Sequence, residues 1–259
     1  MIGDELEAAL PVGPKFNYVL PNFQNPSGST LSLERRRHLV ALADQYGVPI
    51  IEDDPYGQLR YDGEHLPSVV YLDAMYRNDG NSEYTGNVIY LSTFSKLLAP
   101  GLRLAWVVAP PNVIQKLVMT KQAADLHTSS FNQQVAYEVG KGGFLDEHVK
   151  VIRATYKERR DVMLEMMDEM FPSEMRWTKP QGGMFLWGIM PEGVDAADVL
   201  KIAIERKVAF VPGAAFHANG DGANTMRINF SYSSPDLIRE GITRLGATLK
   251  EVLKKNGYH

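Results

Sequence analysis

The chain has 259 residues, of which 44% are hydrophobic and 22% charged, and its formal net charge is −4. That composition is typical of a globular protein with one large domain or two smaller ones. Acidic and basic residues are mixed along the chain. This argues against nucleic acid as the main partner, because a duplex binder needs a concentrated basic face.

Cysteine usage and hydropathy exclude further classes of protein. The chain has no cysteine, which excludes disulfides, thiolate catalysis and metals bound by cysteine. The acidic segment 1–16 has no apolar core of a signal peptide, and no apolar run approaches the length of a membrane span. We therefore expect a cytoplasmic protein that acts on small molecules, without membrane contact and without a metal site.

Short apolar runs alternate with amphipathic helical stretches in the first half of the chain. We predict a strand over 16–20 and a helix over 32–46, whose apolar residues recur at helical spacing and which Gly47 can end. Continuous apolar strands with intervening helices are typical of a parallel or mixed sheet in an α/β domain. Three further buried strands are predicted at 48–51, 87–94 and 102–109.

The pattern changes in the second half. A long helical region is predicted over 112–170, with an interruption at 140–143. We place a domain boundary near residue 140, so that 1–140 form a large α/β domain with the start of an interdomain helix and 141–259 form a smaller α+β domain. After the long helical region comes the segment 175–190. It is followed by a predicted helix at 196–207, short strands at 209–213 and 225–232, and a helix at 235–255.

Polar side chains follow three of the predicted strands. Asn25 comes after the first strand, Asp53 after the second, and the segment 93–96 after the third. In open α/β sheets, ligands bind beyond the carboxyl ends of the strands. An amide, a carboxylate and an amine at three such ends predict a small-molecule site.

Lys96 is the candidate for covalent chemistry. A lysine is usually a solvated surface charge, but this one follows a buried strand and precedes an apolar segment. In a partly dry pocket near other cations, an amine loses its proton more readily, as a Schiff-base lysine requires.

Asp53 is a carboxylate at the end of a buried strand, where an unpartnered charge is costly. It is either a cap or turn residue or the partner that keeps a cofactor's pyridine nitrogen protonated, which makes the ring an electron sink. Tyr56 and Asn25 can each reach a ring oxygen of such a cofactor, although Tyr56 is equally well explained as a half-buried aromatic and Asn25 as a turn residue before proline.

Two further groups suit anions. Thr93, Ser95 and Arg103 supply hydroxyls and a guanidinium around Lys96, and the planar arginine fork matches a phosphate. Arg227 lies in an otherwise apolar strand. Its guanidinium must find an anion there, either a substrate carboxylate or an internal salt-bridge partner.

Seven segments together resemble one protein family. In chain order they are FQNPSG, EDDPY, STFSKLLAPGLRLAW, KQAADLHTSSFNQ, KPQGGMFLW, AFVPGAAFHANG and NTMRINFSY. They are similar to the fold-type I aminotransferases over essentially the whole chain. The nearest subgroup is that of the 2-aminoadipate and kynurenine aminotransferases, which also resembles the effector domains of MocR-type transcriptional regulators. The Ser-Lys segment with its downstream Pro-Gly-x-Arg is the most specific of the motifs.

This resemblance implies a pyridoxal 5'-phosphate (PLP) enzyme that moves an amino group from an amino acid of the 2-aminoadipate, aromatic or branched-chain type to a 2-oxo acid such as 2-oxoglutarate. It also implies a homodimer. By matching motif, Lys96 would bind the cofactor and shuttle the proton, and Asp53 would pair with the pyridine nitrogen. The other implied roles are ring-oxygen ligands for Tyr56 and Asn25, a phosphate cradle for Thr93, Ser95 and Arg103, and a site for the substrate carboxylate at Arg227, with Asn25 beside it.

The chain departs from the family pattern in one large way. Family members carry a long segment before the part that matches 16–20, and it includes the first strands, a phosphate-binding loop at a helix N-terminus and an aromatic that stacks on the cofactor. We therefore expect an N-terminally truncated chain with an incomplete sheet and an exposed edge. Two small departures are Ser27 in place of the commoner threonine and Pro55 in place of alanine.

Three other functions stay open at this point. The same scaffold supports other PLP chemistry, such as β-elimination. The chain also fits the effector-sensing domain of a MocR-type regulator, or an inactive fragment.

Overall fold

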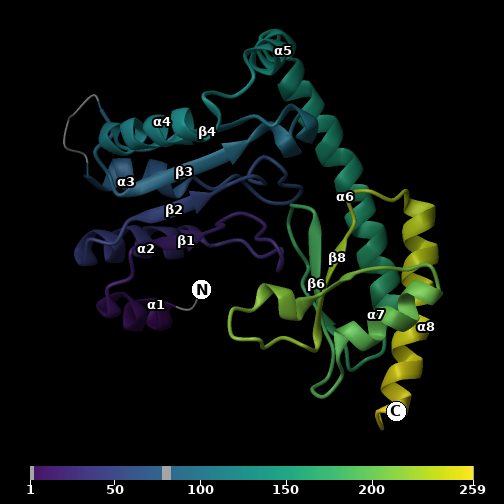
Figure 1. Ribbon diagram of the computed structural model, residues 1–259. Helices are drawn as coiled ribbons and strands as arrows, with labels where there is room; N and C mark the ends of the chain where they lie inside the picture. Colours follow the sequence, from purple (N-terminus) through teal and green to yellow (C-terminus); the bar gives the residue numbers. More distant parts are fainter. Residues whose placement is uncertain (1–2, 78–82, 259) are drawn as a thin grey trace. The chain divides into compact units, whose positions relative to one another are not determined.

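The computed structural model describes residues 3–77 and 83–258, which form two compact units (Figure 1). The first unit comprises Met1–Asn22 and Thr30–Val151, and the second comprises Phe23–Ser29 and Ile152–His259. Within the described ranges, no helix has the length and apolar character needed to cross a membrane.

The first unit contains a four-stranded sheet in the order β1-β2-β3-β4. The first three strands are parallel, and β4 runs antiparallel to β3. This confirms the predicted α/β domain with a mostly parallel sheet. The strands are β1 (Asn17–Val19), β2 (Ile50–Asp53), β3 (Val88–Thr93) and β4 (Ala105–Val108).

Helices bury one face of this sheet. The helix predicted over 32–46 is confirmed as α2, since the Ser32 hydroxyl accepts from the Arg35 backbone N–H and Gly47 ends the helix in the left-handed conformation. Its apolar side chains join those of β1, β2 and β3 in one core that includes Leu39, Ile50 and Val88. The helices of this unit are α1 (Gly3–Ala9), η1 (Leu10–Val12), α2 (Leu33–Tyr46), α3 (Val69–Arg77), α4 (Pro111–Asp125), α5 (Ser130–Gly140) and the start of α6 (Phe144–Met170).

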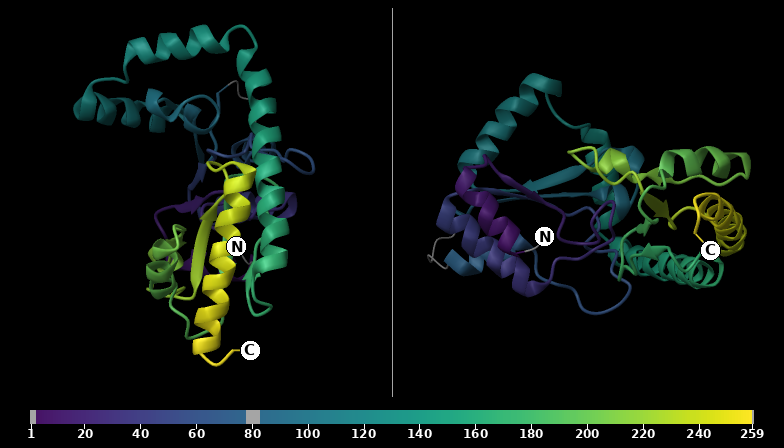
Figure 2. Two further views of the ribbon diagram at one scale, coloured as in Figure 1. Left: turned by 90° about the vertical axis from the view of Figure 1, so that its right-hand side faces the viewer. Right: turned by 90° about the horizontal axis from the view of Figure 1, so that it is seen from below.

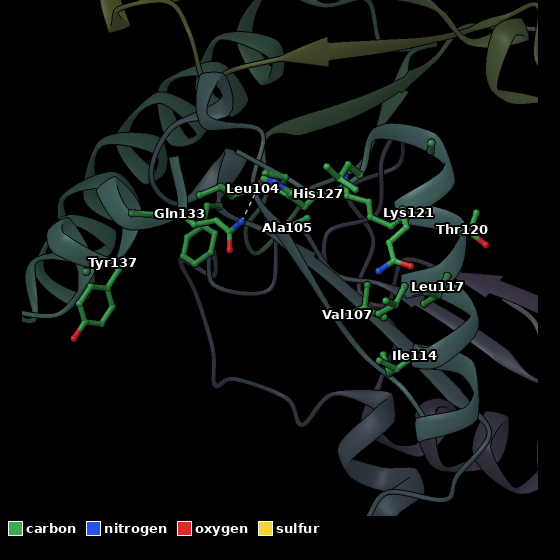
Figure 3. Close-up of a pocket in the computed structure, with 18 of the residues that line it drawn as sticks. Leu104, Ala105, Val107, Ile114, Leu117, Thr120, Lys121, His127, Gln133 and Tyr137 are labelled. Atoms are coloured by element: carbon green, nitrogen blue, oxygen red, sulfur yellow. Dashed lines mark hydrogen bonds between the residues drawn. The ribbon is translucent and has the colours of Figure 1, made fainter. Parts of the chain in front are cut away.

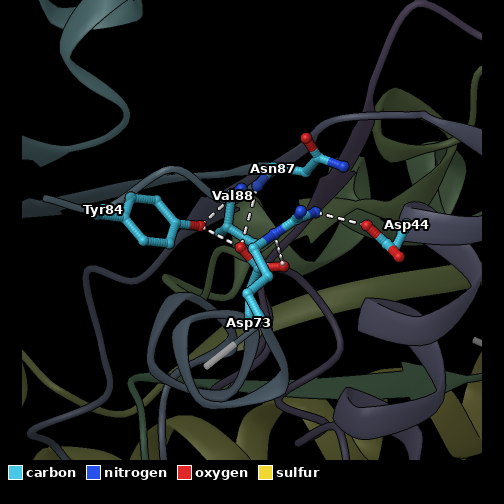
Figure 4. A network of polar contacts seen from close by, with 6 residues as sticks. Asp44, Asp73, Tyr84, Asn87 and Val88 are labelled. Carbon is cyan, nitrogen blue, oxygen red and sulfur yellow. Dashed lines mark hydrogen bonds and ion pairs between the residues drawn. The ribbon is translucent and has the colours of Figure 1, made fainter. Parts of the chain in front are cut away.

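A polar network ties α2 and α3 to the start of β3 (Figure 4). The buried Asp73 carboxylate accepts from the Tyr84 phenol and, at 3.0 Å, from the Asn87 backbone N–H. Arg77 lies 3.4 Å from Asp73 and 2.6 Å from Asp44 of α2. Burial, followed by the bond to Asp73, raises the pKa of Tyr84, so this phenol remains a donor.

The strand predicted within residues 102–109 is confirmed as β4, but the expectation that it is buried is wrong. Strand β4 is at the edge of the described sheet, and Val107 and Val108 are 38% and 42% exposed. An apolar run predicts the same strand whether or not a neighbour covers it, so the pattern could not distinguish an edge from a centre.

The second unit is built around an antiparallel sheet in the order β5-β6-β8-β7. Helix α8 packs beside α7 and along the second half of α6, where Arg239 contacts Glu165 and Met166 (Figures 1 and 2). This confirms the predicted α+β character. The elements are β5 (Arg176–Trp177), β6 (Phe185–Ile189), α7 (Ala196–Glu205), β7 (Val211–Pro212), η4 (Gly213–Phe216), β8 (Thr225–Asn229) and α8 (Pro235–Lys255).

The long helical region breaks twice. The predicted interruption near 140–143 is confirmed, and a second break separates α4 from α5 at residues 126–129. There Leu126 has a φ of 67°, and the Ser129 hydroxyl starts α5 by accepting from the Asn132 backbone N–H. Leucine is a good helix former, so nothing in its type marks this break.

The segment Phe23–Ser29 packs within the second unit, although the chain on both sides of it belongs to the first. Phe23 is fully buried. A Cβ on Gly183 would lie 2.5 Å from Cβ of Phe23, and one on Gly28 would lie 2.7 Å from the Phe185 carbonyl oxygen. These two glycines therefore allow the segment to sit directly on residues 180–185.

Candidate functional site

The carboxyl ends of β2 and β3 carry the candidate carboxylate and amine. Asp53 is the last residue of β2 and pairs with Leu91, and the Asp54 backbone N–H donates to the Leu91 carbonyl at 2.8 Å. Strand β3 ends two residues later at Thr93, and Lys96 follows within one turn. Because parallel neighbours end at the same edge of a sheet, both groups leave the sheet at that edge.

The backbone that carries Lys96 is held by a cap. The 3₁₀ helix η2 (Phe94–Lys96) begins at Thr93, whose Oγ1 accepts from the Ser95 backbone N–H at 3.0 Å. The same Oγ1 lies 2.9 Å from both the Leu104 carbonyl oxygen and Ser95 Oγ. The lysine, which is half-buried, is thus presented from a short, hydrogen-bonded turn.

Arg103 lies near the other end of the loop between β3 and β4. It follows η3 (Pro100–Leu102) and adopts the left-handed conformation, with φ 56° and ψ 40°. Its exposed side chain donates from Nη1 to the Pro100 carbonyl oxygen at 3.0 Å. Left-handed backbone is unfavourable for arginine and is often kept where function needs it. The loop between β3 and β4 therefore presents Lys96, two hydroxyls and a guanidinium.

Asp53 has a partner on the neighbouring strand. The Tyr18 phenol of β1 donates to Asp53 Oδ2 at 2.5 Å. Burial, followed by the bond to Asp53, raises the pKa of Tyr18 and keeps the phenol protonated. The sequence pattern did not single out Tyr18, because its role depends on which strand lies beside β2.

The two acidic residues on either side of Asp53 in the sequence, Glu52 and Asp54, make buried polar contacts. Asp54 accepts from Asn22 Nδ2 at 2.9 Å, and burial is the main cause that raises its pKa. Asn22 in turn accepts from the fully buried Arg36 at 2.6 Å. Glu52 accepts from the backbone N–H groups at the start of α3, both at 2.8 Å. The Asp54 side chain thus ties the loop after β2 to Asn22.

Tyr56 lies in the turn after β2. Its side chain is buried, and its carbonyl oxygen accepts from the Leu59 backbone N–H at 2.7 Å. The expectation of a half-buried aromatic underestimated this burial.

In the second unit, Arg227 and Asn25 meet across 202 positions of the chain. Arg227 Nη1 donates to Asn25 Oδ1 at 2.8 Å. The guanidinium carbon lies 4.4 Å from the Phe185 ring centroid and 5.0 Å from that of Phe216. An amide and two aromatic faces thus orient the guanidinium, which can add paired bonds to a carboxylate. The sequence analysis did not single out the two phenylalanines, because Phe185 meets Arg227 through the pairing of β6 with β8 and Phe216 lies in the 3₁₀ helix η4.

A cavity of about 1250 Å³ opens elsewhere in the first unit (Figure 3). It lies between β4, α4 and α5, and Val107, Leu117 and Tyr137 are among its mainly apolar lining. None of the described residues that line it belongs to the candidate site residues. We assign the chemistry to the strand ends, because the candidate carboxylate and amine lie there.

These features define an α/β protein with a lysine and a carboxylate at neighbouring ends of a parallel sheet and an arginine–asparagine pair in a second, antiparallel unit. The family model described as "Aminotransferase class I and II" matches residues 4–245. The chain belongs to this family, and the resemblance seen in the motifs is confirmed.

Known relatives agree with this assignment. The chain is 47% identical over 241 residues to "Aromatic-amino-acid aminotransferase 1" of Thermococcus litoralis, covering 93% of this chain and 55% of the relative. The structure of LysN, the alpha-aminoadipate aminotransferase of Thermus thermophilus complexed with N-(5'-phosphopyridoxyl)-L-leucine, superposes with a TM-score of 0.90 at 41% identity, over 97% of this chain and 63% of that one. An HTH-type transcriptional regulator of Bacillus subtilis, YisV, is 31% identical over 93% of this chain and 47% of its own length. The chain thus spans about half to two-thirds of the length of these proteins.

Proposed function

We propose that this chain carries the cofactor-binding and proton-transfer residues of a PLP-dependent aminotransferase that moves an amino group between an amino acid and a 2-oxo acid such as 2-oxoglutarate. The observation that supports this most directly is the placement of Lys96 and Asp53 at the adjacent carboxyl ends of β3 and β2.

The donor set of the first unit fits the cofactor. PLP needs an amine for its aldehyde, an anion beside its ring nitrogen, a donor for its ring oxygen and a cradle for its phosphate. When bound, it supplies an electrophilic carbon and an electron sink. Lys96, Asp53 and Tyr56 match the first three needs. The residues proposed for the phosphate are Thr93, Ser95 and Arg103.

The residues then act as follows. Lys96 would hold the cofactor through the bond between Nζ and its aldehyde carbon. With Nζ free, the same amine would act as general base and general acid toward the proton at Cα of the amino acid. Asp53 keeps the ring nitrogen protonated. Arg227, with Asn25, binds the α-carboxylate of the amino acid, and Asn25 also serves the ring oxygen.

The proposed amino donors are of the 2-aminoadipate, aromatic or branched-chain type. The relatives support this range, since they include an aromatic-amino-acid aminotransferase and an alpha-aminoadipate aminotransferase complexed with N-(5'-phosphopyridoxyl)-L-leucine. A cytoplasmic location and a homodimer complete the proposal.

Substitution of Lys96 tests the assignment. Purified chain is titrated with PLP, and the visible absorption band of the lysine-linked cofactor is recorded for the unaltered chain, for Lys96→Ala and for Lys250→Ala, a control at an exposed lysine of α8. We expect the band in the unaltered chain and the control and its loss in Lys96→Ala. A band that survives in Lys96→Ala would refute the proposal.

An effector-sensing domain is the second candidate, favoured by the match to the regulator YisV. Such a domain would bind PLP and an amino acid without turnover. Incubation with amino donor and 2-oxoglutarate separates the two, because glutamate and a new oxo acid form only by transamination. Ammonia with pyruvate would instead indicate β-elimination.

A further inference from the structure

Tyr18 reaches Asp53 because of strand register. In the parallel pair β1–β2, Tyr18 lies opposite Ile51, and Asp53 is two residues further along β2. Side chains at i and i+2 of a strand point to the same face, so Ile51 and Asp53 share the face on which Tyr18 stands. The Tyr18 side chain leans along that face, and its phenol donates to Asp53 Oδ2 at 2.5 Å.

The contact restrains a group that would otherwise rotate. Asp53 is the last residue of β2, and the torsion that turns an aspartate carboxylate about its final carbon–carbon bond is broad and weakly restricted. A short O–H···O⁻ bond is charge-assisted and strong. It occupies Oδ2, while a carboxylate offers about four lone-pair sites over its two oxygens. The same carboxylate can therefore accept from a second donor with its plane already set.

We propose that Tyr18 is a positioning residue that holds the Asp53 carboxylate in the orientation needed to keep the ring nitrogen of PLP protonated. This inference rests on the proposed function of Asp53. Core packing does not explain the tyrosine, because its side chain is 51% exposed. The hydroxyl is the part of Tyr18 that matters, and Tyr18→Phe removes it while keeping the ring.

The test uses two cofactor forms. Dissociation constants are measured for PLP and for its analogue in which carbon replaces the ring nitrogen, with the unaltered chain, Tyr18→Phe and the control Tyr71→Phe, an exposed tyrosine of α3. We expect Tyr18→Phe to weaken PLP binding about tenfold, the size of one hydrogen bond to a charged group. The analogue has no ring nitrogen to protonate, so its affinity should not change. Tyr71→Phe should change neither.

Asp53→Asn provides an independent check. If Tyr18 acts through the Asp53 carboxylate, adding Tyr18→Phe to Asp53→Asn should have no further effect on PLP affinity. Unchanged PLP affinity in Tyr18→Phe would overturn the inference. So would an equal loss for PLP and its analogue, or a further loss in the double variant, since each indicates a role in packing alone.

Failure of the positioning role can be distinguished from failure of the proposed function. If the unaltered chain forms no lysine-linked band, or Lys96→Ala retains it, the proposed function is refuted and the role of Tyr18 falls with it. If the band behaves as expected and only the Tyr18 variants do not, the aminotransferase proposal stands and the positioning role is wrong.

Discussion

Arg227 shows how single contacts prepare a side chain for an anion. Its guanidinium is bonded to the Asn25 amide oxygen and lies against the rings of Phe185 and Phe216. A planar guanidinium can lie against both rings and still offer paired N–H donors to a carboxylate, which a lysine ammonium cannot do.

We therefore expect Arg227→Lys to raise KM for the amino acid at least about tenfold although the charge is kept, because the paired bonds to the carboxylate are lost. Steady-state kinetics with an amino donor and 2-oxoglutarate measure this effect. Arg176→Lys, at an exposed residue of β5, is the control. Unchanged KM in Arg227→Lys would contradict the assigned role.

Glu52 makes stability depend on pH. Burial raises its pKa to about 7 from the usual 4.5, against the two backbone donors of α3 and the attraction of Arg36. The folded chain thus holds this proton more tightly than the unfolded chain. The stabilising contribution is complete below the unfolded pKa and is lost as pH rises through about 7.

The expected loss between about pH 4.5 and pH 7.5 is up to about 3 kcal/mol in the free energy of unfolding. Urea unfolding at several pH values measures it. In Glu52→Gln, the group cannot ionise, so the slope of stability against pH should become smaller over this window. The slope is the quantity to compare, since Gln also alters the bonds to α3. An unchanged slope would show that Glu52 is not the titrating group.

At the scale of elements, Gly86 is a position where a side chain would come too close to its neighbours. A Cβ there would lie 1.8 Å from Asp73 Oδ2 and 2.4 Å from the Tyr84 phenol oxygen, within the network that joins α3 to β3 (Figure 4). Addition of a single methyl group would separate Asp73 from its partners.

Gly86→Ala should destabilise the chain by about 1–3 kcal/mol through overpacking. Gly241→Ala is the matched control. A Cβ at Gly241, inside α8, meets nothing within 4 Å, so alanine there should add up to about 1 kcal/mol of helix stability. Thermal unfolding of both variants checks the pair, and equal midpoints would contradict the proposed crowding.

Elements with local signals could be predicted from the sequence. Helix α2 is capped by Ser32 and Gly47, and α8 spans the residues expected for it, because caps and apolar spacing are encoded within each segment. The break at Leu126 and the exposure of β4 could not be predicted. The first depends on backbone geometry that leucine does not signal, and the second on which strands are neighbours.

The same limit applies to the candidate site. Lys96, Asp53 and Arg227 could be selected from residue type and from their position relative to apolar runs. Tyr18 and Phe185 could not, because their contacts arise from pairing of β1 with β2 and of β6 with β8. Side chains that support a site from an adjacent strand carry no local pattern of their own.

For the whole molecule, the open edge of β4 and the apolar cavity beside it predict self-association. Val107 is exposed on this edge and lines the cavity, and an exposed apolar strand edge is a template for pairing with another chain. Val107→Lys should reduce the concentration dependence of the apparent mass in light scattering. Val12→Lys, at a residue that is 86% exposed elsewhere in the first unit, should not. Equal behaviour of the two variants would show that the edge is not the associating surface.

Because Phe23–Ser29 belongs to the second unit, that unit cannot be isolated simply by cutting the chain once, either with a protease or in the gene. A fragment made of residues 152–259 would hold Arg227 but not its Asn25 partner, and the surface of Gly183 that faces Phe23 would be left bare. Circular permutants that join the two pieces of the second unit, rather than simple C-terminal fragments, are the form in which that unit can be isolated intact.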